Sequence, residues 1–150
     1  MANSYTSLFI HIIFSTHNRT PILKPTIRER LWAYMGGIAR KNKIKAVSIG
    51  GMAEHVHMLI SLPSIVSVSK AVQLIKGGSS KWLHENNNSL RKFAWQEGYG
   101  AFSISASDKD EVMTYIANQE EHHRVRSFQE EYLSFLKEYG IEYDDRYVWG

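Results

Sequence analysis

The stretch EHVHMLIS, residues 54–61, decides how this chain folds. It is short, largely apolar and followed by Pro63, so it is predicted to form a buried strand rather than a helix. Residues two apart on a strand point to the same face, so His55 and His57 should project together and Val56 to the opposite face. Two imidazoles side by side on a rigid strand form half of a metal site. The alternative is a pair of core histidines with hydrogen bonds inside the protein.

Other elements can be placed around this strand from the spacing of apolar residues. A nearly continuous apolar run at the start of the chain predicts a central strand covered on both faces. A short strand just before Gly50-Gly51 is expected to form a hairpin with the His-Val-His strand. Apolar residues spaced three and four apart predict two amphipathic helices. The predicted strands are 7–15, 46–49, 54–61 and 102–105, and the predicted helices are 26–42 and 67–86.

The resulting order, β-α-β-β-α-β, is that of a ferredoxin-like, split β-α-β fold of the α+β class. It predicts an antiparallel sheet with both helices on one face and with the first and third strands in the centre. Thr26 and Glu29 fit a capping box at the start of the first helix. Two C-terminal helices should follow the sheet, one capped by Ser107 or Asp108 and reaching about Gln119, and one over about 127–139.

Composition sets broad limits on the protein. A chain of 150 residues with 43% hydrophobic and 22% charged residues suits a single globular domain, 1–150. The absence of cysteine excludes disulfides and cysteine-based zinc sites. Residues 1–5 lack the basic start of a signal peptide and no apolar run is long enough to span a membrane, so a cytoplasmic location is expected. The net charge of +3 is compatible with a nucleic-acid partner without being diagnostic.

Tyr115 and Gln119 form a second polar feature on the first C-terminal helix. They are four residues apart, so they should lie one turn apart on one helix face, together with Val112 and Ile116. A glutamine on a buried face needs a partner for its amide. A metal ion that accepts the amide oxygen is one solution, and a neighbouring backbone group is the other. For Tyr115 taken alone, packing in the core is the favoured explanation.

The motif HVH at 55–57, followed by YIANQ at 115–119, resembles the HUH single-tyrosine transposases of the insertion-sequence 200/605 family, in which HUH means His-hydrophobic-His. The resemblance extends to STHNR at 15–19, to EHH at 121–123 and to YDDRYVW at 143–149. It therefore covers essentially the whole chain, and it agrees with the predicted order of strands and helices.

The resemblance implies an enzyme that cleaves and rejoins single-stranded DNA at the ends of an insertion element. Tyr115 would be the nucleophile, linked to the 5′ end of the cut strand while a 3′-OH is released. His55, His57 and Gln119 would be the ligands of one divalent metal ion. Imidazole and amide ligands with open positions for phosphate oxygens suit Mg²⁺ or Mn²⁺.

The resemblance also implies partners. Similar proteins are homodimers that recognise DNA hairpins near the element ends, and the active site is assembled in cis or in trans, which the sequence leaves open. His122 and His123 are adjacent and would point about 100° apart on a helix, so a structural or DNA-contacting role is expected rather than joint chelation. Four basic residues are candidate phosphate contacts, the alternative being a solvated basic face: Arg19, Lys70, Lys76 and Lys81.

Two alternatives remain at the level of sequence. One is a related HUH endonuclease, such as a replication initiator or a domesticated relative that has lost its mobile element. The other is a non-catalytic ferredoxin-like module that binds nucleic acid through aromatic residues on its sheet. The third predicted strand carries a histidine pair where such a module would carry its aromatic residues.

Overall fold

Four strands form one antiparallel sheet in the order β2-β3-β1-β4, so the first and third strands are central, as predicted. The computed structural model describes residues 3–150; Met1 and Ala2, part of the segment used above to judge targeting, lie outside the described residues. The strands are β1 (Phe9–Ser15), β2 (Lys45–Gly51), β3 (His55–Ser61) and β4 (Gly100–Ile104). The helices are α1 (Pro25–Lys41), α2 (Val68–Asn86), α3 (Lys109–Ala117), α4 (Gln119–His122) and α5 (Phe128–Glu138).

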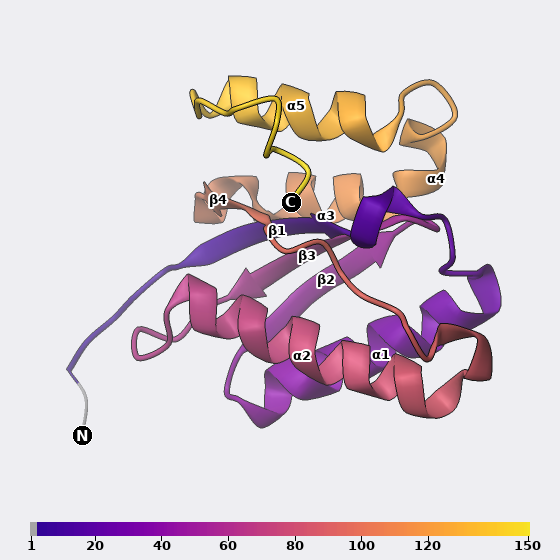
Figure 1. The fold of residues 1–150 in the computed structure, drawn as a ribbon. Coiled ribbons are helices and arrows are strands. Elements are labelled where there is room, and N and C mark those ends of the chain that lie inside the picture. Colours follow the sequence, from indigo (N-terminus) through magenta and orange to yellow (C-terminus); the bar gives the residue numbers. More distant parts are fainter. Residues whose placement is uncertain (1–2) are drawn as a thin grey trace.

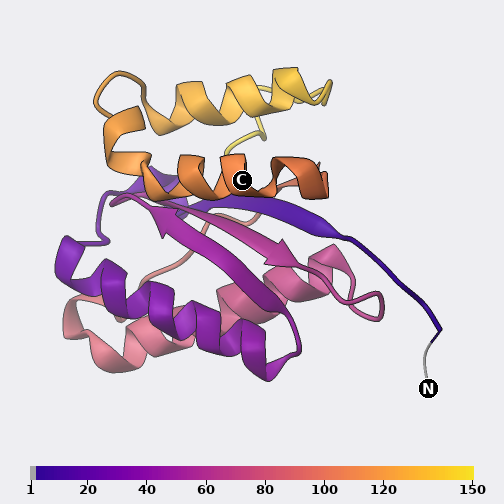
Figure 2. The ribbon, with the colours of Figure 1, turned by 180° about the vertical axis from the view of Figure 1, so that it is seen from behind.

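The helices cover the sheet from both sides. Figure 1 shows α1 and α2 against one face, which confirms the predicted ferredoxin-like arrangement. The C-terminal helices α3 and α5 lie over the opposite face, with the short α4 joining them at one end, and the view from behind agrees (Figure 2). Between residues 3 and 150, no helix has the length and apolar character needed to cross a membrane.

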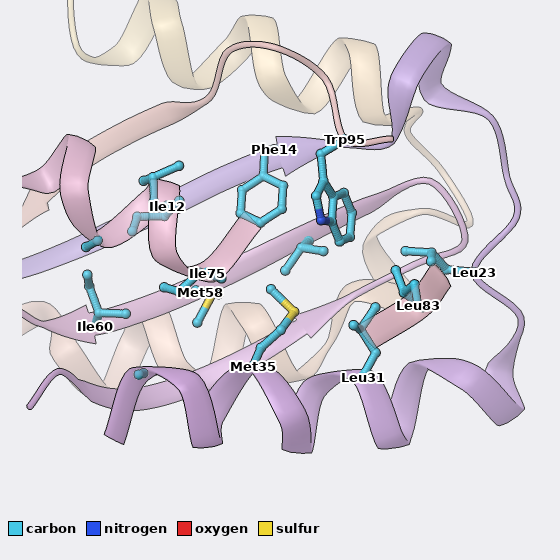
Figure 3. Close-up of a cluster of buried hydrophobic side chains, with 14 of the residues drawn as sticks. Ile12, Phe14, Leu23, Leu31, Met35, Met58, Ile60, Ile75, Leu83 and Trp95 are labelled. Atoms are coloured by element: carbon cyan, nitrogen blue, oxygen red, sulfur yellow. The ribbon is translucent and has the colours of Figure 1, made fainter. Parts of the chain in front are cut away.

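The two-residue period of the strands divides the core into two clusters. Ile12 and Phe14 of β1 and Met58 of β3 point toward α1 and α2, where they pack with Trp95 and other apolar side chains (Figure 3). A smaller cluster on the other face joins β1 and β4 to the inner side of α5. The odd-numbered residues of β3 therefore face α3 and α5, and these include both histidines.

Helix starts follow local capping chemistry. The capping box predicted at Thr26 and Glu29 is wrong, because α1 begins one residue earlier with Pro25 in its first turn and Lys24 at the N-cap. Proline suits this position since its fixed φ matches the helix and its missing N–H would be unpaired there anyway. Ser67 caps α2 through a hydrogen bond from the Lys70 N–H. 

The continuous helix predicted between Ser107 and Gln119 is interrupted. Asn118 leaves the helical conformation at φ −103° and ψ 30°, which ends α3 at Ala117 and lets α4 begin at Gln119. Asp108 stands at the N-cap of α3 without a side-chain capping bond. The break turns the chain toward α5, whose start is fixed by a capping box.

Candidate active site

Two imidazoles of β3 lie side by side on the sheet face that α3 and α5 cover. The side chains of His55 and His57 are fully buried, and their ring centroids are 5.1 Å apart. Val56 between them packs into the core on the other face. The strand thus holds two ring nitrogens under the C-terminal helices with very little freedom to move.

The segment after β4 brings Tyr115 and Gln119 to the same place. Tyr115 is half-buried on α3, and its ring centroid lies 5.8 Å from that of His57. Gln119 is buried at the first position of α4, and its Oε1 lies 2.9 Å from Nε2 of His55. The four residues singled out in the sequence therefore meet within one chain.

A glycine on β2 lets α3 come this close to the sheet. A Cβ atom built on Gly50 would lie only 2.5 Å from the backbone oxygen of Ile116 and 3.0 Å from its Cγ2. Ile116 is buried and directly follows Tyr115 in the sequence. The missing side chain at Gly50 thus sets how deeply the tyrosine sits over the histidines.

Glu131 of α5 is a further member of the site, which the sequence analysis missed. Its side chain is 1% exposed. One oxygen, Oε1, lies 3.0 Å from Nε2 of His57 and 3.2 Å from Nε2 of His123. The other oxygen, Oε2, accepts the hydroxyl hydrogen of Tyr115 and lies 3.4 Å from Nε2 of Gln119.

The signal for Glu131 was present in the sequence. It stands three residues after Phe128 and four before Phe135, which is a position on the apolar face of α5. A carboxylate on a buried helix face requires partners, by the same reasoning that selected Gln119. The polar residue His11, inside the apolar run of β1, was missed in the same way.

Two side chains contact the Nδ1 atoms of the histidine pair and fix the orientation of the rings. Nε2 of His11 lies 2.8 Å from Nδ1 of His57, and Oε1 of Glu54 lies 2.5 Å from Nδ1 of His55. Histidines that bind metal commonly donate the N–H of their second ring nitrogen to such a partner, as His55 can to Glu54. An Nδ1–H that donates to the Glu54 carboxylate would leave the Nε2 lone pair of His55 pointing into the site.

Burial and hydrogen bonding set the ionisation of the site. Burial lowers the pKa of His57 to about 4, although Glu131 opposes the shift, so the ring is neutral near pH 7. Burial and the neighbouring His57 lower the pKa of His11 to about 3. Burial would raise the pKa of Glu131, but hydrogen bonds from His123, His57 and Tyr115 outweigh it and keep the carboxylate ionised. Burial, aided by Glu131, raises the pKa of the Tyr115 phenol, which therefore keeps its proton.

The donor set fits a divalent metal ion. The ligand atoms of His55, His57 and Glu131 lie within 4.8 Å of one another, and all three side chains are buried. Nε2 of His55 lies 2.9 Å from Oε1 of Gln119, and in the tautomer with the hydrogen on Nδ1 both of these atoms are acceptors. Two acceptors at this distance repel each other unless a proton or a metal ion lies between them. Imidazole, carboxylate and amide oxygens together suit Mn²⁺ and also Mg²⁺.

His122 and His123 take separate places, in agreement with the angle expected between neighbours on a helix. His123 points into the site, with Nε2 3.1 Å from Oε1 of Gln119 and 3.2 Å from Oε1 of Glu131. The ring of His122 stacks on that of Tyr115, with centroids 4.3 Å apart and planes 27° apart. Among the described residues, Nε2 of His122 is the one buried side-chain polar atom without a hydrogen-bond partner.

The four basic residues proposed as phosphate contacts lie in different environments. Lys76 is turned inward, and its Nζ donates hydrogen bonds to the carbonyl oxygens of Gln96 at 2.7 Å and Gly98 at 2.6 Å. The guanidinium of Arg19 lies 5.0 Å from the ring centroid of Trp149, close to the C-terminus. Lys70 and Lys81 are exposed on α2, so their ammonium groups are accessible to an anion.

Comparison with known proteins identifies a matching family and related sequences. The family model described as IS200-like transposase matches residues 4–119. The ISDra2 transposase TnpA of Deinococcus radiodurans is 22% identical over 114 residues, which cover 73% of this chain and 81% of that protein. The transposase for insertion sequence element IS200 of Salmonella typhimurium is 25% identical over 121 residues, which cover 77% of this chain and 78% of that protein.

Solved structures share the fold. A candidate transposase of Deinococcus radiodurans superimposes with a TM-score of 0.67 at 22% identity, covering 79% of this chain and 95% of that one. A REP-associated tyrosine transposase bound to a REP hairpin gives a TM-score of 0.61 at 18% identity, covering 82% of this chain and 73% of that one. The family model spans all four strands and the helix that carries Tyr115. The chain therefore belongs to the family of IS200-like transposases.

Proposed function

We propose that this protein cleaves and rejoins single-stranded DNA at the ends of an insertion element, with Tyr115 as the nucleophile and a divalent metal ion at the histidine pair. The observation that carries the proposal is the convergence of the Tyr115 hydroxyl with His55, His57, Gln119 and Glu131 within one chain. A core of satisfied histidines would not need a nucleophile beside it. Membership of a transposase family supports the same class of reaction.

The chemistry of the phosphodiester explains why these residue types are needed. A phenol has a pKa near 10 and is a poor nucleophile unassisted. Tyr115 would form the bond to phosphorus through its oxygen and lose its hydroxyl proton to water, while the bond to the 3′ oxygen breaks and that oxygen takes up a proton to leave as a 3′-OH. A divalent ion held by His55, His57, Gln119 and Glu131 would supply charge neutralisation at the phosphate. The phosphotyrosine keeps the energy of the broken bond, so a 3′-OH can reverse the step without ATP.

A DNA hairpin is the proposed recognition element. One structural relative is described as bound to a REP hairpin, and this chain carries exposed Lys70 and Lys81 on α2. Lysines on one helix face attract a phosphate backbone in a salt-dependent way. We further propose that the protein acts as a homodimer. Each subunit already contains a complete set of site residues. We therefore propose that the active site is assembled in cis, from residues of one subunit.

The test is a labelled single-stranded DNA that carries a hairpin, incubated with the protein and Mg²⁺ or Mn²⁺. We expect a denaturant-resistant protein–DNA adduct whose peptide maps to Tyr115. The Tyr115→Phe variant should lose the adduct and still bind the hairpin, whereas the matched Tyr147→Phe variant, changed at an exposed residue, should behave as wild type. Hairpin binding without any adduct in the wild-type protein would favour the non-catalytic binding module.

A further inference from the structure

Glu131 is placed so that its two oxygens serve two different parts of the site. Oε1 faces the imidazoles, at 3.0 Å from Nε2 of His57 and 3.7 Å from Nε2 of His55. Oε2 accepts the hydroxyl of Tyr115. One carboxylate therefore touches both the proposed nucleophile and the donor atoms of the proposed metal ion.

The backbone that carries Glu131 leaves it little room to move. α5 starts with a capping box in which Ser127 and Glu130 exchange hydrogen bonds. Such a cap stabilises the start of a helix. Phe128 and Tyr132, on either side of Glu131, are buried in the second core cluster. Because the carboxylate is held in place, binding at one oxygen should change the hydrogen bonding of the other.

Glu131 also lies outside the segment that the family model matches. That segment ends at Gln119, whereas α5 begins at Phe128. Glu131 links Tyr115 to the histidine pair, and it belongs to a part of the chain on which the family assignment does not depend.

We propose that Glu131, besides holding the metal ion, couples Tyr115 to the metal site, so that occupancy of the metal site changes how the tyrosine hydroxyl is held. This proposal rests on the function proposed above. A carboxylate that coordinates a cation through Oε1 has less electron density at Oε2 and is a weaker hydrogen-bond acceptor there. The Tyr115 hydroxyl is then held less tightly and is freer to approach a phosphate.

The coupling can be measured without DNA. Tyr115 is replaced by 3-fluorotyrosine in the full chain, Mg²⁺ is titrated, and the ¹⁹F resonance is followed while calorimetry measures Mg²⁺ binding to the same sample. We expect the resonance to shift with the same midpoint as Mg²⁺ binding. A fluorotyrosine at position 34, on α1 across the sheet, is the control and should not respond.

The Glu131→Gln variant isolates the carboxylate, because it keeps an acceptor for Tyr115 but removes the charge. We expect the fluorine shift on Mg²⁺ addition to fall at least several-fold, and DNA adduct formation to fall roughly 10–100-fold, the range found when a residue that supports a metal site is lost. If this variant fails to fold, Glu131→Asp, which retracts the carboxylate by one methylene, should show the same loss of coupling.

Three outcomes would overturn the proposal, and they separate it from the proposed function. Mg²⁺ binding without a shift at Tyr115 would refute the coupling and leave the metal-dependent function standing. An equal shift in the wild-type and Glu131→Gln proteins would show that the tyrosine senses the ion by another route. No binding of Mg²⁺ or Mn²⁺ to the wild-type protein would remove the metal site, and the coupling with it.

Discussion

Replacing Gly50 by alanine should slow the reaction, although Gly50 has no side chain that could take part in it. The new Cβ would lie 2.5 Å from the backbone oxygen of Ile116, whereas ordinary contact begins at 3.4 Å. The difference requires α3 to retreat from β2 by about 0.9 Å, because a strand backbone and a helix backbone face each other there. Tyr115 is the preceding residue and would move with the helix.

The size of the effect follows from this displacement. Overpacking a well-filled contact costs about 1–3 kcal/mol, which corresponds to a fall in Tm of roughly 2–12 °C for a chain of this size. A misplacement of about 1 Å in a catalytic group lowers the rate by roughly 100-fold. We therefore expect Gly50→Ala to remain folded at 25 °C and to form the DNA adduct about 100-fold more slowly.

The assay is the single-turnover rate of adduct formation, measured beside thermal unfolding. Gly77→Ala is the matched control, since a Cβ there meets nothing within 4 Å and alanine in a helix interior is favoured by about 1 kcal/mol. The control should be slightly more stable and react at the wild-type rate. A Gly50→Ala protein that unfolds and reacts like wild type would refute the reasoning that this contact sets the position of Tyr115.

Gln119→Leu should weaken the affinity for the Mg²⁺ or Mn²⁺ that supports cleavage by roughly 10–100-fold. The variant should still show a cooperative thermal unfolding transition. Loss of that transition would indicate that the amide is needed only for packing. Lys76→Met should lower the free energy of unfolding by about 1–2 kcal/mol through loss of its bonds to Gln96 and Gly98, and should leave the salt dependence of hairpin binding unchanged. A reduced salt slope in that variant would mean that Lys76 binds phosphate after all.

The fold was predictable because the sequence carries strong local signals. The apolar run of β1 and the short, largely apolar stretch of β3 define the two central strands, and the spacing of apolar residues defines α1 and α2. The errors lie at helix ends. Pro25 moved the start of α1, and Asn118 broke the helix that was expected to reach Gln119, because the chain must turn there to bring α5 back over the sheet.

The site was less predictable than the fold. His55 and His57 are neighbours on one strand, so their common direction follows from strand geometry alone. Glu131 and His11 come from elements distant in the sequence, and their contacts depend on how α5 and β1 pack against β3. Charged residues are usually exposed, so Glu131, which follows Glu130 on an amphipathic helix, would be expected at the surface. Only its spacing from Phe128 and Phe135 indicates that it lies on the apolar face.

The central claim is that the imidazoles of β3, the amide of Gln119 and the carboxylate of Glu131 bind one cation beside Tyr115. Crystals grown with Mn²⁺ and measured at a wavelength sensitive to manganese test it directly. We expect a single anomalous peak at a coordination distance of about 2.0–2.2 Å from Nε2 of His55 and Nε2 of His57. A peak elsewhere on the protein, with none between the histidines and Glu131 at saturating Mn²⁺, would contradict it.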